Sequence, residues 1–365
     1  MKINIINLGG NIMSINIGII GFAHNHLERY YSEWEKDPSL GVTVVAGWDH
    51  NEERLANAAK NHGFTPYANV EELLAREDVQ AVLITVETSF HADMVEKAAA
   101  AGKAIVLQKP LALTLEQADR IVAAIDKYKV PFSMSWQMRV DPQNLKMKEM
   151  ILNEELGKVL SVRRRHALST HTLKGFENTW HVNPVFNRDI WADDSSHPID
   201  WINSIFGAPE SVTAEVMTLL NPKIPNDNGI AIFRYKSGPL VHVECSFTCV
   251  AAESSTEIIC ERGTIIHNFG DASSCSITRP EGSVGLKWYS IDTGKWTVSD
   301  IPTPPDHWAR IDALAKPIGE FLNGKRGPIA TAEEARTSLR MVLATYVSTR
   351  EGRRVSINDE AIALV

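Results

Sequence analysis

The segment "INIGIIGFAHNH", residues 15–26, decides how the N-terminal part of the chain is interpreted. Its apolar run ends in Gly21 and a helical pattern follows, as in the strand-turn-helix units that bind dinucleotides. In such turns the first glycine makes the bend, the second admits the pyrophosphate, and the third lets helix and strand pack. Gly21 suits the first role, whereas Ala23 and His26 occupy the other two positions. Alone, the turn fits a dinucleotide loop and an ordinary strand-to-helix turn equally well.

Short apolar runs and helical patterns continue to alternate up to about residue 136. Strands are predicted at "VTVVAGW", "QAVLITV", "AIVLQ" and "PFSMSW", and helices at about 24–36, 51–63, 91–101 and 114–128. Continuous apolar strands that alternate with helices predict a parallel sheet covered on both faces. We therefore predict an α/β Rossmann domain that binds a dinucleotide over residues 13–137.

Longer strands with alternating polarity follow after about residue 140, at "KVLSVRRRHAL", "GIAIFRY" and "LVHVECSFTCV". This pattern is typical of a largely antiparallel sheet. Two helical stretches, at about 307–323 and 331–350, close the chain. The second domain, residues 138–365, is therefore predicted to be α+β with a large, mostly antiparallel sheet.

The composition excludes several classes of protein. Of the 365 residues, 37 are basic and 45 acidic, giving a net charge of −8 without a basic block, so a nucleic-acid partner is not expected. No convincing signal peptide or bilayer-length apolar run occurs, and Met13 is a candidate start that would make residues 1–12 an extension. A cytoplasmic protein without a membrane partner is expected. The cysteines lack C-x-x-C spacing, so neither a disulfide framework nor a zinc knuckle is predicted: Cys245, Cys249, Cys260 and Cys275.

Asp49 supports the dinucleotide interpretation of the Gly21 turn. It ends the next apolar strand, where an acidic residue meets the adenosine ribose hydroxyls in dinucleotide sites. A carboxylate there would repel a 2′-phosphate, so NAD is predicted in preference to NADP. Asp49 could also cap the following helix, a role that is compatible with cofactor binding.

Lys109 is a second candidate. In "VLQKPLALTLEQA" it follows a buried strand, which places it at the carboxyl edge of the parallel sheet, where ligands bind in open α/β folds. Considered by itself, an exposed loop lysine is the more common explanation, because lysines are mostly at surfaces.

The segment "WADDSSHPIDW" contains a third group, with Asp193, His197 and Asp200 at i, i+4 and i+7. A histidine flanked by carboxylates is suited to proton transfer. Pro198 predicts that the regular helix begins at about 195–196, with Asp193 just before it. A polar cap with a satisfied histidine is the alternative. Further histidines precede this segment and could face a polar substrate: His166, His171 and His181. No convincing metal-ligand pair such as H-x-x-x-H or H-E-x-x-H is found.

These segments together resemble the glucose-fructose oxidoreductase and inositol dehydrogenase family, often written Gfo/Idh/MocA, over nearly the whole chain from about residue 15. The similar stretches include "INIGIIG", "AGWDHNEER", "AAAAGKAIVLQKPLALTLEQA", "LGKVLSV", "ERGTI" and "TAEEARTSLRMVLATYVSTREGRRV". The most specific is "QKP", which is similar to the family's Glu-Lys-Pro signature after the fifth strand.

The resemblance implies a role for each candidate residue. Lys109 would lie beside the nicotinamide and the substrate, His197 would be the acid/base, and Asp193 would orient His197 or bind a neighbouring hydroxyl. Gln108 replaces the signature glutamate, and "TVETSFH" stands where the family usually has a Thr-Pro-Asn turn. The residues predicted to contact the cofactor are Gly21, Phe22, Ala23, His24, Asp49, His50, Val86, Glu87, His91, Gln108 and Lys109.

The activity that the resemblance implies is an NAD-dependent dehydrogenase acting on a sugar, a sugar derivative or a cyclic polyol. The second domain would bind the substrate and pair through its sheet with other subunits, giving a homodimer or homotetramer. Two alternatives are redox-neutral, NAD-assisted glycoside cleavage or elimination, and a non-catalytic sensor of sugar or NAD. The presence of Lys109, Asp193 and His197 disfavours the sensor.

Overall fold

The computed structural model describes residues 14–250, 254–268 and 281–365, so Cys275 and Met13 lie outside the described residues. The chain forms two compact units. The first extends to Gln137 and also includes Ile311–Arg336, and the second contains Met138–Arg310 and Thr337–Val365. The predicted boundary after residue 137 did not anticipate that a later segment returns to the first unit.

The returning segment is held to the first unit by polar contacts. The indole N–H of Trp34 donates to the carbonyl of Ala315 at 3.0 Å, and Arg29 forms two hydrogen bonds with the carboxylate of Asp312. These partners are almost 300 positions apart, so the hydrophobic pattern of either segment alone does not reveal the contact.

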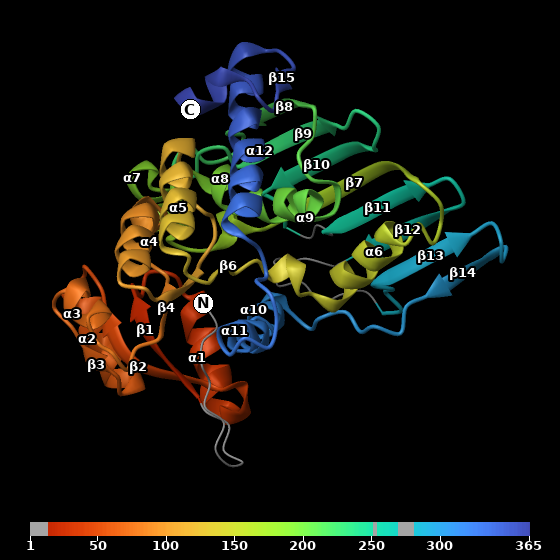
Figure 1. Ribbon diagram of the computed structural model, residues 1–365. Coiled ribbons are helices and arrows are strands. Elements are labelled where there is room, and N and C mark those ends of the chain that lie inside the picture. The colour runs from red at the N-terminus through yellow and green to blue at the C-terminus, as the bar shows by residue number, and fades with distance from the viewer. Residues whose placement is uncertain (1–13, 251–253, 269–280) are drawn as a thin grey trace. The chain divides into compact units, whose positions relative to one another are not determined.

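The first unit is built on a six-stranded sheet with the order β3-β2-β1-β4-β5-β6, and every neighbouring pair is parallel (Figure 1). Every residue of β4 and β5 is buried, as expected for strands of a sheet covered on both faces. The predicted Rossmann domain is confirmed. Its strands are β1 Ile15–Ile20, β2 Val42–Trp48, β3 Thr65–Pro66, β4 Ala81–Ile84, β5 Ala104–Leu107 and β6 Phe132–Met134.

Helices connect these strands, and several begin and end at residues that suit those positions. The Asn51 side chain accepts a hydrogen bond from the Arg54 N–H at the start of α2, and Gly63 ends that helix at φ +72°. Thr114 caps α5 in the same way. The helices of this unit are α1 His26–Lys36, α2 Glu52–His62, α3 Val70–Leu74, α4 His91–Ala100, α5 Leu115–Tyr128 and α11 Ala315–Leu322.

The second unit contains a nine-stranded mixed sheet with the order β14-β13-β12-β11-β7-β10-β9-β8-β15. Only β7 and β10 pair in parallel, so the predicted α+β class with a mostly antiparallel sheet is confirmed. Burial alternates along β8 and β9, which gives the sheet one packed and one outer face. The strands are β7 Val159–Ala167, β8 Ser211–Met217, β9 Asn228–Arg234, β10 Leu240–Ser246, β11 Ser255–Cys260, β12 Gly263–Asn268, β13 Leu286–Ser290, β14 Lys295–Val298 and β15 Val355–Ser356.

The helices of the second unit include α6 Pro142–Leu152, α7 Pro184–Asn187, α8 Ile190–Asp194 and α9 Ser196–Phe206. As Pro198 predicts, α9 begins at Ser196 with Asp193 before it, but Asp193 lies in the separate short helix α8. Two helices contribute residues to both units, because the division falls within them: α10 His307–Asp312 and α12 Ala332–Glu351. The single helix predicted at 307–323 is thus two helices, α10 and α11.

In the described part of the chain, no helix combines the length and the apolar character needed to cross a membrane. Within the same ranges, no group of three or more His, Cys, Asp or Glu side chains is arranged to hold a metal ion. The described cysteines Cys245, Cys249 and Cys260 are free thiols.

Candidate functional site

The turn after β1 requires a glycine. Gly21 has φ +89°, and a Cβ on it would lie 2.3 Å from a methyl carbon of Val86. Its N–H donates to the Trp48 carbonyl at 2.7 Å, and its carbonyl accepts from the Thr85 hydroxyl at 2.5 Å. Hydrogen bonds at this turn therefore link the carboxyl ends of β1, β2 and β4. The turn leads into the N-terminus of α1.

Asp49 is buried at the end of β2, and each of its carboxylate oxygens accepts two hydrogen bonds. One oxygen accepts from the Phe22 N–H at 2.6 Å and from Arg54 Nε at 2.7 Å. The other accepts from the Asn51 N–H and from Arg54 Nη2, both at 2.7 Å. A ribose hydroxyl can bind this carboxylate only when Arg54 releases an oxygen, because the acceptor positions are filled.

Glu87 shares Arg54 with Asp49. Its carboxylate lies 3.0 Å from Arg54 Nη1 and 2.8 Å from His50 Nε2. Burial raises the pKa of Glu87, but the hydrogen bonds from His50 and Arg54 outweigh it and hold that pKa below its ordinary value. Two carboxylates therefore face one guanidinium at this edge of the sheet.

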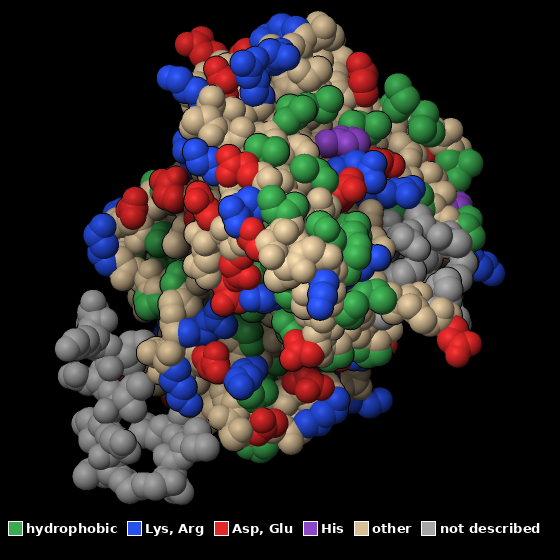
Figure 2. All heavy atoms as spheres, turned by 90° about the vertical axis from the view of Figure 1, so that its right-hand side faces the viewer, with side chains coloured by type: hydrophobic (Ala, Val, Ile, Leu, Met, Phe, Trp, Pro, Cys, Tyr) green, Lys and Arg blue, Asp and Glu red, His purple; other side chains and the backbone are tan. Residues whose placement is uncertain are grey.

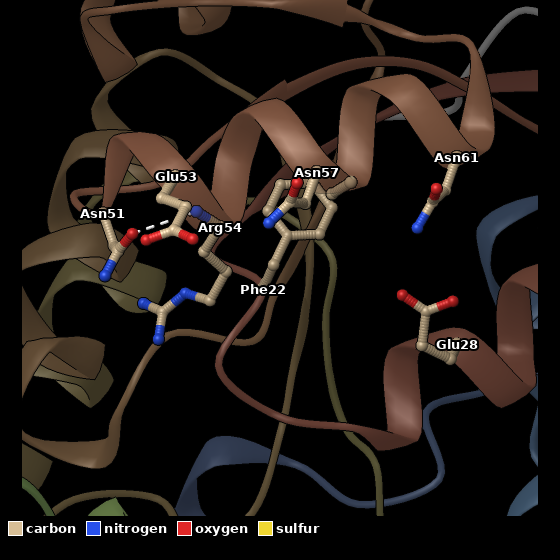
Figure 3. A pocket seen from close by; sticks show the side chains of 8 residues that line it. Phe22, Glu28, Asn51, Glu53, Arg54, Asn57 and Asn61 are labelled. Atoms are coloured by element: carbon tan, nitrogen blue, oxygen red, sulfur yellow. Dashed lines mark hydrogen bonds between the residues drawn. The ribbon is translucent and has the colours of Figure 1, made fainter.

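A cavity of about 340 Å³ borders this network (Figure 3). Arg54 and Phe22 line it and also bond to Asp49, and the Arg54 side chain extends beside Asn51 in the view. Its remaining lining is mostly polar and comes from α1 and α2: Glu28, Glu53, Asn57, Ala58 and Asn61.

Gln108 and His26, two departures from the family pattern, contact each other. The Gln108 amide nitrogen lies 3.4 Å from His26 Nδ1 and donates to the Tyr30 hydroxyl at 3.1 Å. The Gln108 side-chain oxygen accepts from the Lys109 N–H at 2.9 Å. His26 is also packed edge-on against His24, with ring centroids 4.2 Å apart. His26 therefore does not serve as the third glycine; its ring is directed toward Gln108 and Tyr30.

Lys109 follows β5 and is 3% exposed, so it is not the exposed loop lysine of the alternative interpretation. His91 fixes the adjoining loop, with Nδ1 2.9 Å from the Pro110 carbonyl and Nε2 3.2 Å from the Val86 carbonyl. Burial lowers the pKa of His91 to about 4. The hydrogen bonds with backbone carbonyls raise this pKa but offset the effect of burial only in part. His91 is neutral at pH 7 and committed to the backbone, which favours a structural role over the predicted contact with the cofactor.

The predicted cofactor residues thus lie in the loops that follow β1, β2, β4 and β5, apart from His91, which begins α4. Within this set, Val86, His24 and Gln108 are buried, Phe22 and Ala23 are partly exposed, and His50 is exposed. Parallel strands bring their carboxyl ends to one edge, so these loops share that edge of the first unit.

In the second unit the Asp193 carboxylate meets a histidine that the helical spacing does not indicate. His181 Nδ1 lies 2.8 Å from Asp193 Oδ2, and Asp193 is 2% exposed. His197 is equally buried, with Nε2 3.6 Å from the Asp194 carboxylate and its ring 6.2 Å from that of His166. The spacing of Asp193 and His197 spans the junction of α8 and α9, where Ser195 keeps a helical backbone conformation at φ −65° and ψ −20°, so their sharing of one face stays a prediction.

Asp200 has a structural role. Both of its oxygens bond to the Arg139 guanidinium, at 2.7 and 2.9 Å, and one also accepts from the Ser338 hydroxyl. The Asp200 side chain is fully buried. It neutralises a buried arginine, a pairing that the helical spacing does not indicate.

Sequence reasoning did not identify Arg54, His181 or Arg139 as partners of the acidic residues. Arg54 follows Asp49 by five positions on a predicted helix, which is a usable signal. The local pattern does not connect His181 with Asp193, because short helical turns separate them in the chain. It does not connect Arg139 with Asp200 either, because they belong to different elements.

Comparison with known proteins identifies two matching family models. Residues 15–135 match the model described as "Oxidoreductase family, NAD-binding Rossmann fold", and residues 144–266 match the GFO/IDH/MocA C-terminal domain.

Individual relatives are distant but cover most of the chain. D-apiose dehydrogenase of Paraburkholderia graminis is 25% identical, over 94% of this chain and 89% of its own length. Myo-inositol 2-dehydrogenase of Thermotoga maritima is 23% identical, over 85% and 90%. The solved structure of a levoglucosan dehydrogenase with NADH and levoglucosan has a TM-score of 0.76 at 19% identity, covering 95% of this chain and 100% of that chain.

Proposed function

Because this chain belongs to the Gfo/Idh/MocA family of NAD-binding oxidoreductases, we propose that it oxidises a hydroxyl of a sugar, a sugar derivative or a cyclic polyol. The observation that carries the proposal is the buried Lys109 at the end of β5, at the carboxyl edge of the sheet that also contains the Gly21 turn. The names of the relatives support the substrate class, since they are dehydrogenases of apiose and myo-inositol.

The residues of the first unit fit NAD. The Gly21 turn leads to the N-terminus of α1, where backbone N–H groups and the helix dipole favour a pyrophosphate. Asp49 and Glu87 provide carboxylates at the end where the adenosine ribose is expected. NAD supplies the hydride acceptor, and the protein supplies alignment and proton transfer.

We assign the chemistry of the chain's own residues as follows. His197 takes the proton of the substrate hydroxyl as the C–H bond is broken. Lys109 donates a hydrogen bond to the oxygen as it becomes alkoxide-like, which stabilises the developing negative charge.

A panel of sugars and polyols tests the proposal. Purified protein is incubated with NAD and each compound while NADH absorbance is followed, and at least one compound should produce NADH. Glycosides incubated without added NAD form the second arm, because cleavage there with no net NADH would support the redox-neutral alternative instead.

The preference for NAD is a prediction of its own. A 2′-phosphate would meet the carboxylates of Asp49 and Glu87, whose negative charge the Arg54 guanidinium offsets in part. We expect NAD to bind at least about tenfold more tightly than NADP, the factor that corresponds to about 1.4 kcal/mol. Calorimetric titration with both dinucleotides measures this ratio. Equal or tighter binding of NADP would show that attraction of the 2′-phosphate by Arg54 outweighs its repulsion by the two carboxylates.

We further propose that the outer face of the second unit's sheet forms a subunit interface. Figure 2 shows hydrophobic side chains interspersed with charged ones over one face of the molecule. Four exposed apolar residues on neighbouring strands share the outer face of the sheet: Met217, Ile230, Ile232 and Leu240.

This interface predicts a homodimer or homotetramer in solution. Ile232→Asp would place a charge among these four apolar side chains, so the variant should dissociate into monomers while keeping its fold. Light scattering at micromolar concentration gives the mass of each protein. A monomer mass for the wild type refutes the interface.

A further inference from the structure

The partner of Asp193 indicates a role for His181. An ionised carboxylate only accepts hydrogen bonds, so its 2.8 Å contact with Nδ1 places the proton of a neutral imidazole on that nitrogen. In this tautomer the other ring nitrogen, Nε2, is a hydrogen-bond acceptor. Asp193 is nearly fully buried and lies in α8, whose start is capped by the Asp189 side chain. Burial and the capped helix therefore hold the Asp193 carboxylate in one position.

The His181 ring is held in position from other sides as well. The Trp180 ring stacks on it at a centroid distance of 4.0 Å, and the Phe176 ring lies nearly parallel at 6.1 Å. The Asn187 amide donates to the His181 carbonyl at 3.2 Å. Preorganised side chains bind ligands without a further loss of rotamer freedom.

The His181 ring is open to solvent in part. Its side chain is 20% exposed, whereas that of Asp193, which supports it, is 2% exposed. A ligand can thus reach the His181 ring in the conformation described. Next to it, the indole of Trp180 is partly exposed, and a flat aromatic surface beside a polar acceptor suits a ring that carries hydroxyl groups.

We propose that His181 is a specificity-determining residue whose Nε2 accepts a hydrogen bond from a substrate hydroxyl other than the one that is oxidised. Asp193 is the positioning residue that fixes its tautomer. The inference rests on the proposed function, because it assumes a polyhydroxylated substrate.

The test is a cycle of protein variants and deoxy substrates. His181→Asn suits it, because the asparagine amide nitrogen lies where Nδ1 lies and can still donate to Asp193, whereas no atom replaces Nε2. For the best substrate of the panel and its singly deoxygenated analogues, kcat and KM are measured. The wild type should disfavour one analogue by about 3- to 10-fold in kcat/KM, the size expected for losing one hydrogen bond at a partly exposed group.

In His181→Asn this discrimination should fall to about onefold, through a rise in KM for the full substrate with kcat nearly unchanged. The matched control is His171→Asn, because His171 lies in the same segment and contacts the Phe247 carbonyl at 3.3 Å. It should retain the wild-type ratio. Unchanged discrimination for every analogue in His181→Asn overturns the inference, and so does a large loss of kcat with unchanged KM, which would make His181 an acid/base.

Two further measurements cover a variant that does not fold and a substrate that is not found. If His181→Asn does not fold, Asp193→Asn should reduce the same ratio, because its amide can donate to Nδ1, which places the ring proton on Nε2 and removes the acceptor. If the wild type reduces NAD with no compound, the proposed function fails. Saturation-transfer NMR with the same polyols, which needs no turnover, then still decides whether His181 binds them, since the signal should weaken in His181→Asn; an equal signal contradicts the inference.

Discussion

Lys109→Ala is expected to lower kcat by about 10²- to 10³-fold, the range measured when one donor to a developing oxyanion is removed. The reason is the position of the side chain. Lys109 is buried directly after β5, so its charge acts away from bulk water, where an electrostatic contact is strengthened. NAD affinity should change much less than kcat, because the effect is confined to the reacting oxygen.

Steady-state kinetics and calorimetry on the same preparation separate the two effects. Lys97→Ala is the matched control, since Lys97 is an exposed lysine of the same unit that pairs with Glu71. It should keep wild-type turnover. Full activity of Lys109→Ala would remove this residue from the chemistry, and a loss of NAD binding alone would make it a cofactor ligand only.

His197→Ala is expected to lower kcat by about 10²- to 10⁴-fold, the usual contribution of a positioned acid/base. His197 is buried near the Asp194 carboxylate, which stabilises the ring once it has taken a proton. The protein should remain folded, with NAD affinity close to that of the wild type.

The control for His197 is His171→Ala, which removes a histidine of the same unit that bonds to a backbone carbonyl. Circular dichroism and NAD titration establish that both variants are folded. If folded His197→Ala turns over at nearly the wild-type rate, His197 has the structural role of the alternative interpretation, and the acid/base must be sought elsewhere.

The fold could be predicted from local signals because each signal acts over one element. Apolar β-branched runs mark the buried parallel strands, Gly21 marks the turn that no larger residue can make, and Pro198 marks the start of α9. The same reasoning placed Asp49 and Lys109 correctly at strand ends, since the carboxyl edge of a parallel sheet follows from strand direction alone.

The partners of the acidic side chains could not be predicted, because tertiary structure chooses them. Asp193 was expected to orient His197 or to bind a neighbouring substrate hydroxyl, and its carboxylate also pairs with His181, 12 positions upstream. Asp200 was expected beside His197, and its carboxylate is also the counter-ion of the buried Arg139. Each buried carboxylate pairs with a partner that neutralises it or donates a hydrogen bond to it. Helical spacing carries no information about such partners from other elements.

The departures from the family pattern illustrate the same point. In the sequence, Gln108 and His26 are separate substitutions that weaken a motif. In the structure the Gln108 amide contacts both His26 and Tyr30 while accepting from the Lys109 backbone. A neutral amide both donates and accepts here, so the loop that carries Lys109 is supported without the signature carboxylate.

In the proposed reaction the chain moves a hydride from a substrate carbon to NAD and releases NADH. A substrate of the panel that is deuterated at the carbon bearing the reacting hydroxyl follows this hydride. Mass spectrometry of the released cofactor should find the deuterium in NADH, in equal amount to the oxidised product. Deuterium that returns to the product, with no NADH released, would show that the net reaction is redox-neutral and that the proposed oxidation is wrong.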